Sequence, residues 1–190
     1  KPRSNARVNG REQTLVWMDL EMTGLDPDTC AIVQMAVILT DTELNELDDP
    51  LEITIWQPPS VLEVMTPYVR SMHEKSGLLE QIRRSTVSVD VAEHRAMELV
   101  SHHCSYRTAR LAGNSIQQDR RFLVKYMPRL EGYLHYRQVD VSSIKELAGY
   151  WYGLRFEKAD DEGAKHTALY DIRQSIAELK FYRERLFKER

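Results

Sequence analysis

The chain has 190 residues, of which 42% are apolar and 29% charged, and its formal net charge is −3. This length suits a single globular domain, and the composition is ordinary for a soluble protein. No apolar stretch of the sequence approaches the roughly 18 residues of a membrane span. The lack of a basic excess argues against a protein that grips long duplex nucleic acid through many phosphates, but it leaves room for a small anionic substrate.

The N-terminal segment indicates where the domain begins, and the two cysteines indicate the cellular compartment of the protein. The first thirteen residues carry four basic side chains and lack the apolar middle of a signal peptide. We therefore expect a flexible tail over residues 1–13 and one domain over residues 14–190. Cys30 and Cys104 show no zinc-ligand spacing, so buried free thiols in a reducing cytoplasm are favoured over a disulfide.

The first third of the chain is predicted to form three strands joined by short turns. The first strand has few polar positions before Asp19, which is typical of a strand buried on both faces. Turn residues from Gly24 to Pro27 follow it, and two prolines stop the third strand. Short connections predict an antiparallel meander. The predicted strands cover residues 14–21, 31–40 and 51–57.

The remaining sequence alternates predicted helices with short strands. Apolar residues at spacings of three and four predict the helices, and a capping-box pattern at Ser143 and Glu146 predicts one helix start. A meander followed by this alternation predicts an α/β fold with a central mixed five-stranded sheet flanked by helices. The predicted helices cover 61–72, 89–103, 116–127, 143–151 and a last segment that includes 169–186, with strands at 110–112 and 138–141.

Two acidic residues end the first predicted strand. Asp19 and Glu21 are two positions apart, so both carboxylates lie on the same face of the strand. Two like charges there repel each other unless a cation lies between them. Asp119 falls in the first turn of its predicted helix, where the helix dipole alone also favours a carboxylate. Taken alone, each acid is more typical of a solvated strand end or a helix start than of a metal ligand.

A histidine and a fourth acid come near the start of the last predicted helix. Asp171 follows His166 by five positions, about 500° of helical rotation, so the two converge only if His166 precedes the helix. The four acids together predict a site for hard divalent cations such as Mg²⁺ or Mn²⁺. Two such ions can hold a phosphodiester between an attacking and a leaving oxygen. His166 could then take a proton from the attacking water.

Three segments resemble the exonuclease motifs of the DEDD nucleases. In order they are Asp19-Leu-Glu21-Met-Thr-Gly-Leu25-Asp, Gly113-Asn-Ser-Ile-Gln-Gln-Asp119-Arg-Arg-Phe-Leu and, in the histidine version, His166-Thr-Ala-Leu-Tyr-Asp171. From about Leu15 to Phe187 the chain resembles the oligoribonuclease family. The resemblance implies a ribonuclease-H-like exonuclease fold, two divalent ions, a homodimer, and 3′→5′ cleavage of short RNA, especially dinucleotides, to 5′-mononucleotides.

The resemblance also implies a role for particular residues. His166 would be the general base, and the metal ligands would be Asp19, Glu21, Asp119 and Asp171. Leu25 would wedge between two bases, and Tyr68, where family members often have tryptophan, would stack on a base. Arg137 can hold a phosphate through its planar fork. The residues that would cap the 5′-phosphate end are His73, Ser115, Arg137 and Ser142, and Tyr136 would be offered across the dimer.

Alternatives remain at several of these positions. Leu25 could cover the core, Tyr68 could pack within its helix, and Ser142 could only cap a helix. Gln34 departs from the glutamate that relatives commonly carry. A proofreading or RNA-trimming exonuclease that acts on longer DNA or RNA would share the same acids, and a binding module with a dead site is the other competing function. The segment around Tyr136 favours an enzyme for short substrates, because a capped end excludes long strands.

Overall fold

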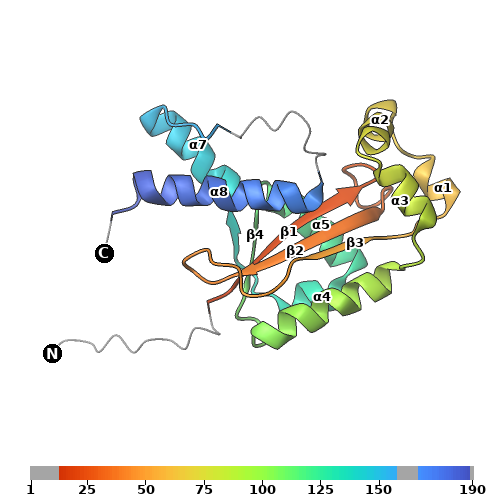
Figure 1. The fold of residues 1–190 in the computed structure, drawn as a ribbon, viewed down its shortest axis with the longest axis horizontal. Coiled ribbons are helices and arrows are strands. Elements are labelled where there is room, and N and C mark those ends of the chain that lie inside the picture. The colour runs from red at the N-terminus through yellow and green to blue at the C-terminus, as the bar shows by residue number, and fades with distance from the viewer. Residues whose placement is uncertain (1–12, 158–166, 189–190) are drawn as a thin grey trace.

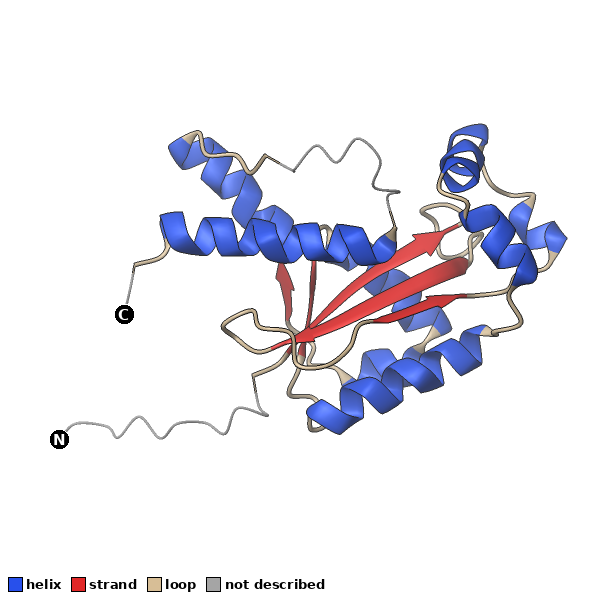
Figure 2. Cartoon of the chain, viewed as in Figure 1, coloured by secondary structure: helices blue, strands red, loops and turns tan. Residues whose placement is uncertain are grey.

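The computed structural model describes residues 13–157 and 167–188 and is built around a mixed sheet (Figures 1 and 2). The strand order is β3–β2–β1–β4–β5. β2 is antiparallel to both β1 and β3, whereas β4 is parallel to β1 and β5. The predicted meander and the mixed five-stranded sheet are confirmed. The strands are β1 (Leu15–Met22), β2 (Ile32–Thr40), β3 (Leu51–Thr54), β4 (Arg110–Gly113) and β5 (Gln138–Asp140).

Helices cover both faces of this sheet (Figure 1). On one face α4, α5 and α6 pack against the sheet, and on the other face α7 and α8 do. α1, α2 and α3 lie beyond the end of β1, where its arrowhead points in Figure 1. The helices are α1 (Pro59–Leu62), α2 (Pro67–Lys75), α3 (Leu78–Arg84), α4 (Val89–His103), α5 (Ile116–Tyr126), α6 (Pro128–Tyr133), α7 (Val141–Tyr152) and α8 (Ala168–Leu186).

The alternation of side chains along β1 divides the core between the two faces. Val16, Met18 and Leu20 belong to the cluster shared with α4, α5 and α6. Trp17 belongs to the cluster shared with α7 and α8, and its Nε1 donates to Thr40 Oγ1 at 2.9 Å. Because the period of a strand is two, positions 19 and 21 continue the Trp17 face. The strand therefore carries its two acids toward the side of the sheet that α8 covers.

The single helix predicted over residues 61–72 is wrong, because this stretch is divided between the end of α1 and the start of α2. Pro67 has no N–H to donate to a continuing helix, and it begins α2 at the first helical position. Thr66 caps α2 by accepting from Val69 N at 3.3 Å. Gly77 has φ +76°, a left-handed conformation that glycine adopts without strain, and it separates α2 from α3. The predicted helix joined apolar positions across the break at Pro67, and α3 was not predicted.

Two other predicted boundaries differ from the structure. Pro128 ends one helix, as predicted, but it also begins α6, which the sequence analysis did not predict. The capping box at Ser143 and Glu146 is wrong, since α7 begins at Val141 with Asp140 as its N-cap. The carboxylate of Asp140 accepts from Ser142 N at 3.0 Å and so satisfies one of the free amides in the first turn of α7.

The ends of the chain and the cysteines complete the description. Of the predicted tail over residues 1–13, only Gln13 lies within the described residues. Cys30 and Cys104 are both free and buried, as predicted. Among the helices in the described part of the chain, none is both long and apolar enough to cross a membrane.

Candidate active site

Three of the predicted acids converge at the end of β1. Asp19 and Glu21 come from this strand, and Asp171 comes from the first turn of α8. Each offers a carboxylate oxygen, and the three oxygens lie within 4.8 Å of one another. Thr167 caps α8 by accepting from Tyr170 N at 3.2 Å and so fixes where the helix that carries Asp171 begins. His166 precedes this cap in the sequence and lies outside the described residues.

The fourth acid, Asp119, lies against the same strand from the opposite helix layer. Its Oδ1 accepts from Leu20 N at 2.9 Å, between the positions of Asp19 and Glu21. The residue is 7% exposed, and this burial raises its pKa to about 7. Burial also raises the pKa of Glu21 to about 7, with smaller contributions from the charges of Asp171 and Asp119. Charging this cluster is therefore unfavourable without a cation.

This donor set fits a hard divalent cation. All the converging ligand atoms are carboxylate oxygens, which Mg²⁺ and Mn²⁺ prefer over softer ligands. A bound cation would offset the cost of charging these buried carboxyls, the main cause of the raised pKa of Glu21 and Asp119. The observation that favours a metal is thus the proximity of acids that are costly to ionise together.

His73 is buried beside this cluster. Its Nε2 lies 2.9 Å from the carbonyl oxygen of Met22, so that nitrogen donates the hydrogen bond. The Nδ1 atom lies 4.0 Å from Glu21 Oε2. The structure therefore places His73 against the end of β1, where it supports the backbone after Glu21. Its predicted contact with a 5′-phosphate stays a prediction.

Two predicted serines lie side by side at the ends of β4 and β5. The two hydroxyl oxygens, Ser115 Oγ and Ser142 Oγ, are 3.3 Å apart, and Ser115 N donates to Ser142 Oγ at 3.0 Å. Both residues line a cavity of about 330 Å³ that Asp19 and Asp171 also line. Gly113, two residues before Ser115, permits β4 to lie close to β1, because a Cβ at Gly113 would lie 3.1 Å from Met18 O. The serines and two acids of the cluster thus share one cavity.

The predicted base-contacting side chains are exposed. Leu25 is 72% exposed and Tyr68 is 78% exposed. The alternatives in which Leu25 covers the core and Tyr68 packs within its helix are therefore wrong. Exposed side chains of this size are free to contact bases.

The loop that carries Leu25 is held in place from α5. Gln118 Nε2 donates to the carbonyl oxygen of Leu25. Tyr126 OH makes hydrogen bonds to the carbonyl oxygens of Pro27 and Cys30, at 3.0 and 2.6 Å. The exposed leucine therefore projects from an anchored turn, which lowers the entropy cost of presenting it to a ligand.

Tyr136 and Arg137 project from the turn before β5. Both are exposed, and Arg137 Cζ lies 5.4 Å from the centre of the Tyr136 ring. The ring of His135 is also stacked on that of Tyr136, with centroids 4.6 Å apart. Stacking leaves the donors of the guanidinium available to an anion.

Four polar or charged residues that the sequence analysis did not select also line the cavity. They are Asn114, Lys145, Ser175 and Glu178. Ser175 and Glu178 follow Asp171 by four and seven positions, so helical periodicity could have placed them on the same face of α8. The sequence does not predict that these two residues contact Asn114 or Lys145, because those contacts depend on how α8 packs on the sheet.

Gln34 lies next to the acids in the sheet. It is the cross-strand partner of Glu21 in the β1–β2 ladder, and it is buried. Its Nε2 donates to Thr54 Oγ1 on β3 at 3.4 Å. The departure from the family pattern is therefore a neutral amide on the same face of the sheet as Glu21, adjoining the acidic cluster.

The raised pKa values predict that the metal-free protein loses stability as pH rises. The folded state holds protons on Glu21 and Asp119 up to about pH 7, whereas the unfolded chain releases them near pH 4. Between these values the folded state binds more protons, so stability falls with pH and the loss is complete above about pH 7. One such carboxyl corresponds to a destabilisation on the order of 3 kcal/mol, or roughly 5–10 °C in Tm.

Thermal unfolding in chelator at pH 5.5 and pH 8 checks this prediction. The Tm should be lower at pH 8, and Glu21→Gln should remove much of the difference. Glu63→Gln, at an exposed glutamate of α1's C-cap, is the matched control and should leave it unchanged. A Tm that rises from pH 5.5 to pH 8 in the unmodified protein would contradict the prediction.

Many known proteins are similar to this chain in sequence or in fold. The model of the exonuclease family RNase T matches residues 16–179. The oligoribonuclease of Pseudomonas paraeruginosa is 48% identical over 176 residues, which cover 93% of this chain and 97% of that protein. The oligoribonuclease of Francisella tularensis is 46% identical over 173 residues, covering 90% of this chain and 95% of that protein.

Solved exonuclease I structures share the fold. The enzyme from Methylocaldum szegediense superposes with a TM-score of 0.68 at 21% identity, over 93% of this chain and 41% of that one. Exonuclease I of E. coli in a zinc-bound complex with single-stranded DNA gives 0.72 at 16% identity, over 92% and 41%. The chain thus spans less than half the length of these structures, and at this identity the likeness concerns the fold alone.

Proposed function

Because the chain belongs to the oligoribonuclease family, we propose that it is a 3′→5′ exoribonuclease that hydrolyses short oligoribonucleotides, dinucleotides above all, to 5′-mononucleotides. The observation that carries the proposal is the shared cavity, in which Asp19 and Asp171 of the acidic cluster lie on the same walls as Ser115 and Ser142. The phosphodiester that is cleaved and the 5′ end that is recognised would therefore lie close together in the same cavity. A site of that kind suits a substrate of very few nucleotides.

The enzyme uses divalent metal ions, and we infer two, Mg²⁺ or Mn²⁺. Asp19, Glu21 and Asp171 would hold them through the converging oxygens, with Asp119 as the fourth ligand beside Leu20. When bound, the ions supply Lewis-acid stabilisation of the charge that develops on the phosphodiester oxygens. His166, the proposed general base, would take the proton of the attacking water.

Polar groups would hold the 5′-phosphate end of the substrate, and the exposed side chains of Leu25 and Tyr68 would contact its bases. Arg137 presents a planar set of donors that matches a phosphate, and Ser115 adds a hydroxyl. Leu25 and Tyr68 would separate and stack on the bases. Such a site needs few phosphate contacts, which agrees with the net charge of −3.

A homodimer is the proposed assembly. α7 exposes a run of large side chains that a single chain leaves in contact with water, namely Leu147, Tyr150, Trp151 and Tyr152. Contiguous apolar surface of this kind marks interaction sites. Sedimentation that found only monomers at micromolar concentration would contradict the dimer. We further infer one exonuclease domain over residues 14–190 and a cytoplasmic location, the latter supported by the two free thiols.

Cleavage of 5′-phosphorylated RNAs of two to seven nucleotides tests the function. With Mg²⁺ we expect rapid conversion of the dinucleotide to mononucleotides, rates that fall as length grows, and no reaction in chelator. The reason is that a capped end admits a dinucleotide but leaves longer strands poorly accommodated. Equal or faster cleavage of the longer strands would move the enzyme to the trimming or proofreading class.

The same series with Arg137→Ala separates end recognition from catalysis. Loss of a charge-assisted contact should lower kcat/KM for the dinucleotide roughly ten- to hundredfold, and less for the heptamer. Arg83→Ala, at an exposed arginine paired only loosely with Glu80 at 3.9 Å, is the matched control. An equal loss on all lengths would argue against an end cap at Arg137.

A further inference from the structure

The acidic cluster is assembled from two layers of the fold. Asp19 and Glu21 lie on β1, whereas Asp171 lies on α8, which packs on that face of the sheet. The three carboxylate oxygens stay within 4.8 Å of one another only while α8 keeps its position on the sheet. Apolar packing alone does not fix that position, because hydrophobic contacts have no preferred direction. Hydrogen bonds between α8 and the sheet are directional and can fix it.

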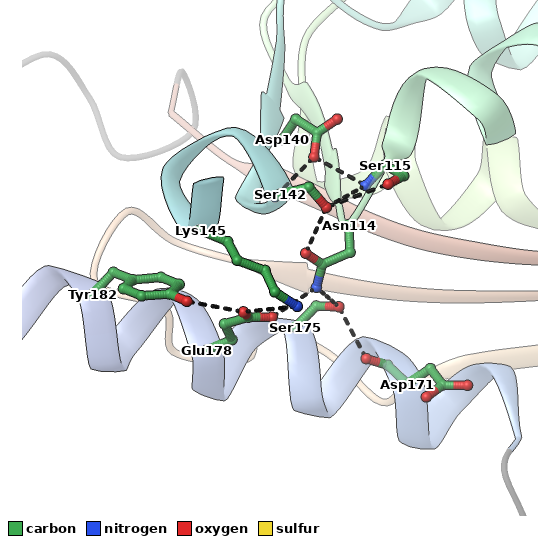
Figure 3. A network of polar contacts seen from close by, with 9 residues as sticks. All are labelled: Asn114, Ser115, Asp140, Ser142, Lys145, Asp171, Ser175, Glu178 and Tyr182. Atoms are coloured by element: carbon green, nitrogen blue, oxygen red, sulfur yellow. Dashed lines mark hydrogen bonds and ion pairs between the residues drawn. The ribbon is translucent and has the colours of Figure 1, made fainter. Parts of the chain in front are cut away.

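Asn114, the residue after β4, makes such hydrogen bonds (Figure 3). Its Nδ2 donates to Ser175 Oγ at 2.8 Å and to Glu178 Oε2 at 3.1 Å. Ser175 Oγ in turn donates to the backbone carbonyl oxygen of Asp171 at 3.0 Å. Asn114, Ser175 and Glu178 thus form a bridge between the sheet and α8, and one arm of this bridge continues to the backbone of a proposed metal ligand.

The bridge lies level with the acids of β1. β4 is parallel to β1, and Ala112 is the partner of Trp17 in this pair. Continuing the register by two residues places Asn114 beside Asp19 and on the same face of the sheet. Both residues line the same cavity, as this register requires. The bridge therefore holds α8 at the height of the metal site.

The Asn114 amide has one favourable orientation in the bridge. Ser175 gives its only proton to the carbonyl oxygen of Asp171, so its oxygen can only accept from Asn114. The carboxylate of Glu178 also accepts. A rotated amide would place Oδ1 against both acceptors and lose two hydrogen bonds. The bridge is therefore compatible with one placement of α8.

Glu178 is a buried carboxylate in a largely apolar interface. The residue is 1% exposed, and the cluster that α8 shares with the sheet is otherwise mainly apolar. Its Oε1 accepts from Tyr182 OH at 3.2 Å and lies 3.8 Å from Lys145 Nζ. Together with Asn114, these three partners are donors. A buried carboxylate is costly to desolvate and contributes little net stability, but its directed contacts restrict how the helix can pack.

We propose that Asn114 and Glu178 are positioning residues, which hold α8, and with it the carboxylate of Asp171, against the two acids of β1. Each acts on the metal site through the helix rather than as a ligand. The proposal rests on the proposed function, whose metal site it extends by two residues. Groups that orient metal ligands typically contribute roughly ten- to hundredfold in metal affinity.

The test is the affinity of the substrate-free protein for Mn²⁺, measured by calorimetric titration and so independent of catalysis. Glu178→Leu removes both acceptor oxygens and should lower this affinity roughly ten- to hundredfold. Glu178→Gln keeps one oxygen for Asn114, and its nitrogen can donate to the Tyr182 hydroxyl. Its affinity should therefore stay within about threefold of that of the unmodified protein. A loss in Glu178→Gln as large as in Glu178→Leu would overturn the bridge, because charge alone would then be responsible.

Ile176→Val is the matched control for a loosened helix. Ile176 is buried on the face of α8 that packs on the sheet, and its truncation leaves the hydrogen bonds of the bridge in place. The Tm in chelator should fall by roughly 2–4 °C, while the affinity for Mn²⁺ stays unchanged. An equal loss of affinity in Ile176→Val and Glu178→Leu would overturn a specific role for Glu178.

A double variant tests Asn114. Asn114→Ala should lower the affinity for Mn²⁺ by a factor similar to that of Glu178→Leu, and the two changes together should lower it no further, because both remove the same bridge. Losses that multiply would overturn the shared role. If Glu178→Leu does not fold, Ser175→Ala replaces it, since it removes one arm of the bridge together with the contact to the Asp171 carbonyl. Unchanged affinity in Ser175→Ala would then overturn the proposal.

The unmodified protein separates this proposal from the function on which it rests. If it binds Mn²⁺ and hydrolyses the dinucleotide while Asn114→Ala and Glu178→Leu bind Mn²⁺ as tightly, the positioning role is overturned and the function stands. Absence of both Mn²⁺ binding and hydrolysis in the unmodified protein would overturn the proposed function together with the positioning role.

Discussion

Asp19→Ala is expected to lower metal-dependent hydrolysis of the dinucleotide by at least about 10³-fold. Lewis-acid stabilisation of a reacting phosphate contributes several kcal/mol, and each 1.36 kcal/mol corresponds to a factor of about ten in rate. The carboxylate of Asp19 is one of three whose oxygens lie within 4.8 Å of one another. Without it, the remaining acids cannot hold a cation in the same position, so the loss should appear in kcat and in metal affinity together.

The same substitution should not weaken the metal-free fold. Asp19 contributes charge to a cluster in which burial and neighbouring acids already raise the pKa of Glu21 to about 7. Its removal lowers that repulsion, so Tm in chelator should stay equal or rise, while the rise in Tm on adding Mn²⁺ should disappear. Asp49→Ala, at an exposed aspartate of the loop before β3, is the control. Unchanged turnover in Asp19→Ala would remove this residue from the metal site.

The acidic cluster was predictable because it depends on short periods. Asp19 and Glu21 lie on one face since a strand repeats every two residues, and Asp171 lies in the first turn of a helix that the sequence also predicted. The mixed sheet followed from the order of apolar segments. The pairing of Asp19 with Glu21 and the mixed sheet need only local geometry and the rule that consecutive elements pack as neighbours, whereas the approach of Asp171 from α8 was expected from the resemblance to the exonuclease motifs.

Contacts between distant segments could not be predicted in the same way. His73 reaches the carbonyl of Met22 from 51 positions away, and Asn114 reaches Glu178 from 64. Both contacts depend on the packing of a helix on the sheet, which residue spacing does not encode. The break at Thr66-Pro67 was visible as residue types, but the apolar pattern across it predicted one helix over residues 61–72. Tertiary packing, rather than periodicity, decides these cases.

His166→Ala is expected to reduce kcat for the dinucleotide by roughly 10²- to 10⁴-fold, the usual contribution of a positioned general base. α8 begins at Ala168 with Thr167 as its cap, so the described helix starts after His166 in the sequence. This meets the condition under which His166 and Asp171 can converge. Substrate binding should be largely preserved, because the residue is proposed to act on the water rather than to hold the phosphate.

Three measurements distinguish a general base from a residue that only supports the site. In the unmodified protein at saturating metal, kcat should rise through the ordinary histidine pKa of about 6.5, and His166→Ala should remove this inflection. Added imidazole should restore part of the lost rate, since a small base can enter the space left by the side chain. His94→Ala, at an exposed histidine of α4 that pairs with Glu98 at 3.5 Å, should behave as the unmodified protein. Weakened binding with a normal rate per complex would instead assign His166 to substrate binding, because a base that only removes a proton cannot change affinity while leaving the chemical step intact.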